Sequence, residues 1–219
     1  MDLDIPEEWA KMYANRKDER TVEYPFVWRK LHPPEAGWKT ILDVGCCESG
    51  IIEVLASLDY VAFGIDIRCW SKISKREPRF IFVKGDIRDT YFPDGFFDQI
   101  TCISTVEHIG LNAYDNLWID DGGDHKAMSE MHRILRDGGN LLLTVPFGNH
   151  FNDYWVRYYK SSTLRALLKG FKDVKTEFWM SPPQPDFGKW KQCTEAEAMK
   201  QGIEKGGLPL AVALVQASK

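Results

Sequence analysis

The chain has 219 residues, of which 44% are hydrophobic and 27% charged, with a net charge of −4 and a pI of about 5.8. This length fits one α/β domain with a substantial core, and the acidic balance excludes a general electrostatic attraction to nucleic acid. No apolar run approaches the roughly 20 residues that span a bilayer, and the acidic N-terminus is unlike a signal peptide. The five cysteines form no C-x-x-C pair, so we expect reduced thiols in a cytoplasmic protein, with neither membrane nor nucleic acid as partner.

Apolar runs and amphipathic segments alternate along the chain, without an internal repeat. Residues 1–35 are expected to form a helical N-terminal extension, followed by one domain over residues 36–219. Short apolar runs predict strands at 41–44, 60–65, 80–83, 99–103, 140–145, 172–179 and 208–216. Helical patterns occur at 51–58, 124–135 and 162–171, the second being followed by a stop at Gly138-Gly139. Strands that alternate with helices indicate βαβ units and a largely parallel sheet.

The last two expected strands are joined by a long connection, residues 181–207, which contains a Pro-rich loop and a short helix. Thr194 and Glu197 have the spacing of a capping box at the start of that helix. A connection of this length suits an antiparallel pair of strands at the sheet edge.

The segment 41–50, ILDVGCCESG, is a strand, then a turn bounded by Gly45 and Gly50, then a helix N-terminus that directs backbone N–H groups at a ligand. The loop spells G-x-C-x-x-G, one residue from the dinucleotide fingerprint G-x-G-x-x-G. The Cβ of Cys47 would crowd a pyrophosphate, and Asp43 and Glu48 would repel it. The same acids suit a positively charged ligand such as S-adenosylmethionine.

The ends of the following strands carry residues suited to a nucleoside. Asp66 ends the second strand, where a carboxylate can accept hydrogen bonds from both ribose hydroxyls. Asp86 and Ile87 follow the third strand, where they could meet the amine and the face of adenine. The fourth strand ends at residues 104–108 and the fifth at residues 145–147. Acids after three successive strands together predict a nucleotide cofactor.

These segments resemble the class I S-adenosylmethionine-dependent methyltransferases, over roughly residues 38–180 and a final strand at 208–217. The matching stretches are ILDVGCCESG, YVAFGIDIR, FVKGDIRD, FFDQITCISTVEHIG and MHRILRDGGNLLLTVP. The resemblance implies a three-layer α/β/α Rossmann-like sandwich. Its seven-stranded, mostly parallel sheet would have the order 3-2-1-4-5-7-6, with strand 7 antiparallel.

Carried over by position, the resemblance implies a cofactor site for S-adenosylmethionine. Its methionine part would lie against Asp43, Gly45 and Cys46, its ribose against Asp66 and Ile67, its adenine against Asp86 and Ile87, and its sulfonium near Ser104. Two residues depart from the family, which commonly has glycine at the positions of Cys47 and Ser49.

Methyl transfer from a sulfonium mainly needs an aligned nucleophile, and a base only when the accepting atom must lose a proton. His108, after the fourth strand, is the expected general base because its pKa lies near neutrality. The alternative that Glu107-His108 only orients the next segment stays open. His125 and His150 are weaker candidates, and no metal ion is expected.

Two loops at the same end of the sheet, residues 110–124 and 147–159, are expected to cover the acceptor. Tyr114, Trp118 and other aromatics there could stack on a sugar or an aromatic acceptor, or instead pack the loops or form a dimer surface. The stretch 19–28 could fold over the cofactor, with Arg20 for its carboxylate. We expect O-methylation of a saccharide or natural-product hydroxyl by a monomer or homodimer.

Two other classes share the fold. The first is an NAD(P)-dependent oxidoreductase with a degenerate glycine loop, against which Cys47 and Glu48 argue. The second is a non-catalytic Rossmann-like interaction module, against which the acids at all three cofactor positions argue.

Overall fold

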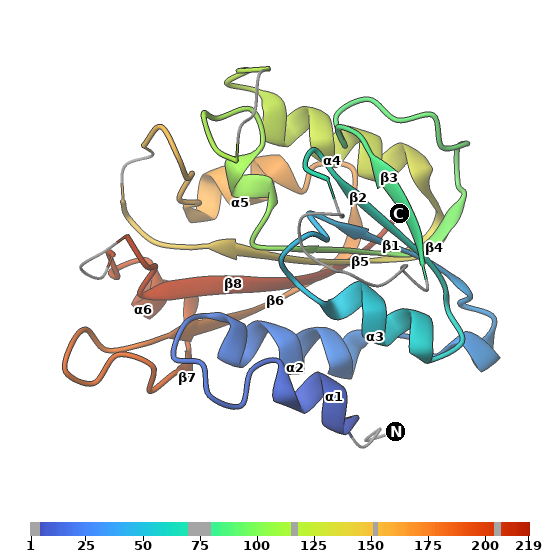
Figure 1. The fold of residues 1–219 in the computed structure, drawn as a ribbon. Helices are drawn as coiled ribbons and strands as arrows, with labels where there is room; N and C mark the ends of the chain where they lie inside the picture. The colour runs from blue at the N-terminus through green and yellow to red at the C-terminus, as the bar shows by residue number, and fades with distance from the viewer. Residues whose placement is uncertain (1–4, 70–79, 115–117, 151–152, 204–206) are drawn as a thin grey trace.

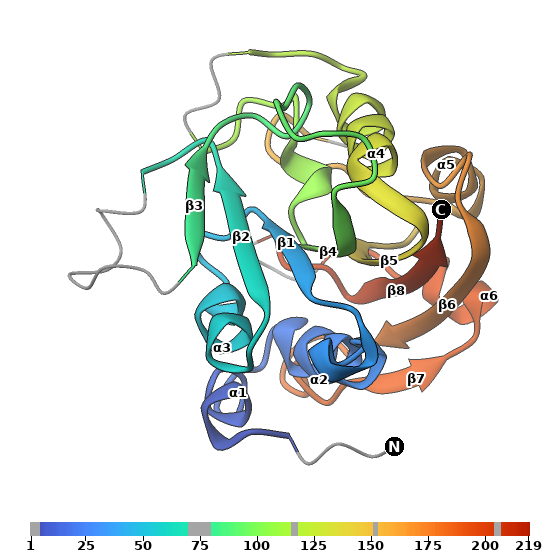
Figure 2. The same cartoon turned by 90° about the vertical axis from the view of Figure 1, so that its right-hand side faces the viewer.

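The computed structural model describes residues 5–69, 80–114, 118–150, 153–203 and 207–219. Helices cover both faces of one mixed sheet, with α1, α2 and α3 on one side and α4 and α5 on the other (Figures 1 and 2). The expected three-layer α/β/α class is confirmed. Within the described ranges, none of the helices has the length and apolar character needed to cross a membrane.

The sheet has eight strands in the order β3-β2-β1-β4-β5-β8-β6-β7. Their bounds are β1 Thr40–Val44, β2 Val61–Asp66, β3 Ile81–Lys84, β4 Phe97–Ile103, β5 Leu135–Pro146, β6 Lys172–Met180, β7 Lys191–Cys193 and β8 Ala211–Ser218. Strands β1 to β5 pair in parallel, and β8 runs antiparallel between β5 and β6. Counting β8 as the seventh strand reproduces the order 3-2-1-4-5-7-6, with one strand added at the edge.

The added strand β7 corrects the expected count of seven. It lies in the 181–207 connection and pairs antiparallel with residues 178–180 of β6. The three residues Lys191–Cys193 carry no apolar alternation and are largely exposed, so backbone pairing with the edge of the sheet forms this strand. The short helix that follows is capped as predicted, since the Glu197 carboxylate accepts from the Thr194 N–H at 2.8 Å.

Helices α3 and α5 are shorter than their patterns predict, whereas α4 has the predicted length and begins one residue earlier. The helix bounds are α1 Glu7–Lys11, α2 Arg20–Lys30, α3 Ile51–Ser57, α4 Gly123–Ile134, α5 Ser161–Leu167 and α6 Glu195–Ala198, with single 3-10 turns η1 Pro34–Ala36 and η3 Val106–His108. Helix α4 ends before Gly138-Gly139 because the backbone at Leu135 is already extended and pairs with Phe97 of β4.

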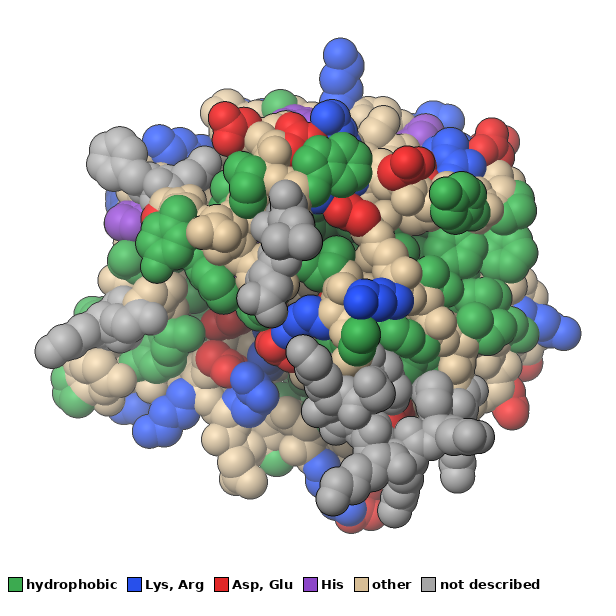
Figure 3. Space-filling model, turned by 45° about the horizontal axis from the view of Figure 1, so that its top comes forward, with side chains coloured by type: hydrophobic (Ala, Val, Ile, Leu, Met, Phe, Trp, Pro, Cys, Tyr) green, Lys and Arg blue, Asp and Glu red, His purple; other side chains and the backbone are tan. Residues whose placement is uncertain are grey.

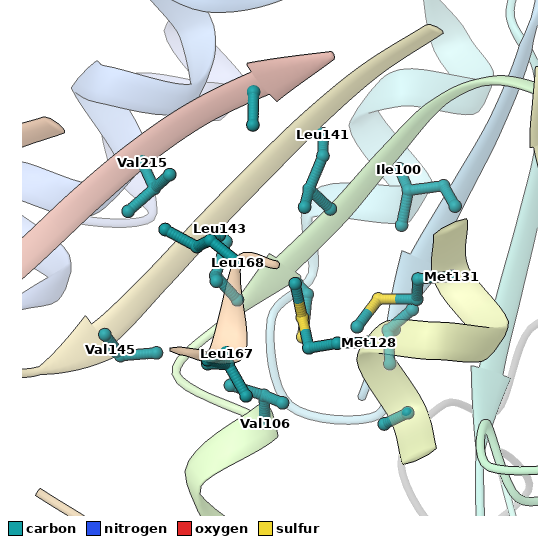
Figure 4. Packing of buried hydrophobic residues seen from close by; sticks show 14 of the residues in the cluster. Ile100, Val106, Met128, Met131, Leu141, Leu143, Val145, Leu167, Leu168 and Val215 are labelled. Atoms are coloured by element: carbon teal, nitrogen blue, oxygen red, sulfur yellow. The ribbon is translucent and has the colours of Figure 1, made fainter. Parts of the chain in front are cut away.

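The core has one hydrophobic cluster on each side of the sheet. Alternate residues of β5 show the division, since Leu141 and Leu143 face α4 and α5 whereas Leu142 faces α2. Figure 4 shows Met128 and Met131 of α4 packed over this face of β4 and β5. On the other face, Trp9 of α1 is fully buried. The division of the chain at residue 35 stays a prediction, but both N-terminal helices share a cluster with β1 and α3.

Candidate cofactor and acceptor site

A cavity opens at the carboxyl ends of β1 to β4, where parallel α/β sheets place their ligands. Its volume is about 950 Å³, counting the open space at its mouth. Six of the eight predicted cofactor residues line it: Gly45, Asp66, Ile67, Asp86, Ile87 and Ser104. His108, Tyr114 and Arg20 line it as well. The cavity therefore brings most of the predicted site together.

The loop after β1 depends on two glycines in the left-handed region. The φ angle is +78° at Gly45 and +66° at Gly50, which is the N-cap of α3. A side chain at Gly45 is also excluded by packing, because its Cβ would lie 2.4 Å from the Thr105 hydroxyl. The first glycine thus lets the loop lie close against the end of β4.

Asp43 and Cys46 lie behind this loop and are not among the residues that line the cavity. The Asp43 carboxylate accepts hydrogen bonds from the Thr101 and Ser49 hydroxyls, both at 2.8 Å, and burial raises its pKa to about 6. Cys46 packs over Gly64 of β2, where an added Cβ would lie 2.7 Å from its sulfur. Both residues shape the loop, and their contact with a cofactor stays a prediction.

The two positions that depart from glycine also make internal contacts. Cys47 is buried in the cluster beneath the sheet, and its N–H donates to Asp66 Oδ2 at 3.1 Å. Ser49 lines the cavity while its hydroxyl holds Asp43. The Cys47 backbone therefore links the loop after β1 to the end of β2, and the Ser49 side chain ties the same loop to Asp43 of β1.

Asp66 and Asp86, the two acids expected to bind the nucleoside, each begin a three-residue turn with the same sequence, Asp-Ile-Arg. The Arg68 guanidinium bonds both oxygens of Asp66, at 3.1 Å from each, and the Arg88 guanidinium holds Asp86 in the same way, with Nη2 at 2.6 Å from Oδ2. Burial alone would raise the pKa of Asp66, but the bonds from Arg68 and Cys47 hold it below its usual value. Asp66 is therefore ionised at neutral pH.

Helix α2 reaches the cavity beside the end of β4. Ser104 has a left-handed φ of +40°, an uncommon conformation for serine, and its hydroxyl donates to Glu23 at 2.7 Å. Glu23 in turn holds Arg20 at 2.5 Å. The stretch 19–28 therefore lies against the cavity as expected, with Arg20 and Tyr24 on its wall.

His108 is placed as a neutral base. Its Nδ1 lies 2.7 Å from the Trp155 carbonyl oxygen, which can only accept, so Nδ1 carries the proton and Nε2 keeps its lone pair. Burial lowers the pKa of His108 below its usual value. The neighbouring Glu107 is buried with its pKa raised well above the usual value, and its Oε2 has no partner within the described residues.

Other predicted residues lie outside the cavity wall. His125 and His150 do not line the cavity, and Trp118 packs under Arg88 with its ring centre 4.1 Å from the guanidinium carbon. Arg157 donates to the carbonyls of Ile109 and Asp121, which ties the two expected cover loops together. The loop of residues 110–124 contributes Tyr114 to the cavity wall. The loop of residues 147–159 contacts the site through the Trp155 carbonyl, which is hydrogen-bonded to His108.

Several lining residues were not singled out in the sequence: Arg16, Arg68, Arg88 and Ile109. The sequence does contain an indication of Arg68 and Arg88, because Asp66 and Asp86 are both followed by the same Ile-Arg pair. On the face shown in Figure 3, basic and acidic side chains are interspersed among hydrophobic ones, and the basic ones do not gather into one patch.

A family of known proteins matches this same region. A sequence model of the methyltransferase domain family matches residues 42–143, which run from β1 into β5 and include the four strand ends at the cavity. The match to the methyltransferase domain family thus covers a little under half of the chain. This match agrees with the expected methyl donor, S-adenosylmethionine.

The proteins similar to this chain are distant relatives. An uncharacterised protein of Methanocaldococcus jannaschii is 23% identical over 157 residues, which are 65% of this chain and 63% of that protein, so the chain spans less than two thirds of it. A SAM-dependent methyltransferase of Archaeoglobus fulgidus superposes with a TM-score of 0.59 at 16% identity, over 97% of this chain and 98% of that one.

A third relative was solved with ligands. The 1,6-didemethyltoxoflavin-N1-methyltransferase of Burkholderia thailandensis, with 1,6-didemethyltoxoflavin and S-adenosylhomocysteine bound, gives a TM-score of 0.56 at 15% identity, over 97% of this chain and 85% of that one. Structural likeness at these identities establishes the shared fold and no more.

Proposed function

We propose that the chain transfers the methyl group of S-adenosylmethionine to a small-molecule acceptor held between Ser104, His108 and Tyr114. The observation that carries this proposal is the convergence of Asp66, Asp86 and Ser104 on one cavity, beside His108, whose Nε2 carries the lone pair and lies 3.9 Å from Glu107 Oε1. The residues fit the cofactor, since ionised Asp66 suits ribose hydroxyls and Ile87 suits the face of adenine.

The chemistry asks two things of the protein. S-adenosylmethionine supplies a methyl group that is already activated, so the chain must hold the acceptor in line and take up its proton. With a hydroxyl acceptor, the bound cofactor would supply its methyl carbon to the acceptor oxygen, and the electron pair of the carbon–sulfur bond would stay with sulfur. Nε2 of His108 receives the hydroxyl proton, which its lowered pKa allows at neutral pH.

A small acceptor, with a saccharide or natural-product hydroxyl favoured, suits this cavity better than a nucleic acid does. The acceptor side is walled by aromatic and apolar residues, Tyr114, Ile109 and Ala113, which suit stacking on a compact molecule. The net charge of −4 gives no general attraction to a phosphate backbone. We further propose that the protein works in the cytoplasm, as a monomer or homodimer.

Titration calorimetry tests this proposal. We expect S-adenosylmethionine and S-adenosylhomocysteine to bind with micromolar dissociation constants and NAD to give no heat. Tight binding of NAD, or no binding of either sulfur compound, would contradict it. Transfer of an isotope-labelled methyl group, screened over hydroxyl and amine acceptors, then identifies the acceptor atom.

A further inference from the structure

The Asp66 carboxylate, proposed to hold the cofactor ribose, is already fully hydrogen-bonded within the protein. Its Oδ1 accepts from the Arg68 backbone N–H at 2.9 Å and from Arg68 Nε at 3.1 Å. Its Oδ2 accepts from the Cys47 N–H and from Arg68 Nη2, each at 3.1 Å. A carboxylate oxygen accepts about two hydrogen bonds, so two ribose hydroxyls can bind only if two of these donors leave.

The donors that can leave are those of the Arg68 side chain. The two backbone N–H groups belong to the loop after β1 and to the turn after β2, and they are fixed by the fold. The Arg68 side chain is 25% exposed, and Glu48, itself 60% exposed, forms a second ion pair with it. Its guanidinium carbon also lies 4.6 Å from the centre of the Tyr114 ring. These two contacts can keep the guanidinium in place after it releases Asp66.

Arg88 provides the internal comparison, because it bonds Asp86 through the same atoms in the same Asp-Ile-Arg turn. Its side chain is only 1% exposed. Its Nη1 donates to the Trp118 carbonyl at 2.7 Å, and its guanidinium lies over the Trp118 ring. Arg88 is therefore fixed, and it anchors the first cover loop.

We propose that Arg68 is a positioning residue that competes with the cofactor ribose for Asp66 and, once displaced, stays between Glu48 and Tyr114. This proposal rests on the proposed function, since it requires the ribose to bind at Asp66. The Tyr114 ring packs edge-on against His108, with ring centres 5.1 Å apart. Binding of the ribose therefore affects the acceptor side, because Arg68 contacts Tyr114 and Tyr114 contacts His108.

The test is the affinity of S-adenosylhomocysteine for variants of the whole chain, measured by calorimetry. Arg68→Ala should bind about fivefold more tightly than the wild type, because a partly exposed ion pair opposing the ribose contributes up to about 1 kcal/mol. Arg68→Gln should show a gain in the same direction. Arg88→Ala is the matched control and should bind no more tightly than the wild type.

A second cycle separates competition for Asp66 from a general charge effect. In an Asp66→Asn background, the gain from Arg68→Ala should vanish, because the competing ion pair is already gone. An unchanged or weaker affinity of both Arg68 variants, or a gain that persists with Asp66→Asn, would overturn the proposal. Failure of the wild type and all variants to bind S-adenosylhomocysteine would instead overturn the proposed function, and this inference with it.

Discussion

The cofactor side and the acceptor side of the cavity are built by different means. The cofactor side consists of residues directly at the ends of β1, β2 and β3, and Asp66 and Asp86 there are each paired with an arginine two residues along the chain. The acceptor side is assembled from η3, α2, Tyr114 and the Trp155 carbonyl, which lie far apart in the sequence. The positions of the cofactor-side residues are set by the strands, whereas those of the acceptor-side residues are set by the packing of separate loops.

Their charges differ in consequence. Asp66 on the cofactor side keeps a pKa below its usual value because its donors outweigh burial. Behind the acceptor side, burial raises the pKa of Glu107 well above its usual value, and burial with the nearby Glu23 raises the pKa of Glu19 to about 7. Asp66 on the cofactor side is therefore ionised at neutral pH, whereas Glu107 behind the acceptor side is protonated.

The largest expected effect is on the acceptor side. His108→Ala should lower turnover about 100- to 1,000-fold, since a positioned general base contributes in that range, with S-adenosylhomocysteine affinity within about twofold of wild type. Wild-type activity should fall as the pH drops through the lowered pKa of His108, because its protonated form cannot act as a base. Steady-state kinetics over pH measures both. Full turnover in the variant would reduce His108 to a structural residue.

On the cofactor side, Asp66→Ala should weaken S-adenosylhomocysteine binding about 100-fold, because two hydrogen bonds to a charged acceptor are lost. Asp98→Ala is a suitable control, since that carboxylate bonds Thr40 and Arg136 instead of lining the cavity. Calorimetry compares the two variants. Equal affinities of the two variants for S-adenosylhomocysteine would show that Asp66 does not bind the ribose.

Asp43 is the cofactor-side acid whose pKa is raised, to about 6. A raised folded-state pKa means that ionisation costs folding free energy above pH 6, and that this cost disappears below the unfolded value of about 4. As the pH falls from 7 to 4, the wild type should therefore gain up to about 3 kcal/mol of unfolding free energy relative to Asp43→Asn. Urea unfolding at several pH values measures the difference. A constant difference between the two proteins would contradict the assignment.

The smallest effect concerns the packing of the loop after β1. Gly64→Ala should destabilise the fold by about 1–3 kcal/mol, because its Cβ would meet the Cys46 sulfur at 2.7 Å. Adding Cys46→Ala should recover part of that loss, which thermal unfolding can measure. Equal destabilisation with and without Cys46 would place the strain elsewhere.

Residues at the ends of strands can be placed from the sequence more readily than residues that the packing of separate loops brings together. Asp66 and Asp86 directly follow apolar runs, so recognising the strands was enough to place them. Cys46 could not be placed in this way, because its side chain points to Gly64 of a neighbouring strand and only the packed sheet reveals that contact. The role of Trp118 as a support for Arg88, and the three-residue β7, likewise depend on contacts between distant segments.

A crystal structure with S-adenosylhomocysteine bound tests the central claim most directly. We predict both ribose hydroxyls about 3 Å from Asp66 oxygens, the adenine against Ile87, and the sulfur facing Ser104 and His108, with the Arg68 guanidinium withdrawn toward Tyr114. A ligand whose ribose lies away from Asp66, or whose sulfur faces away from His108, would contradict the account.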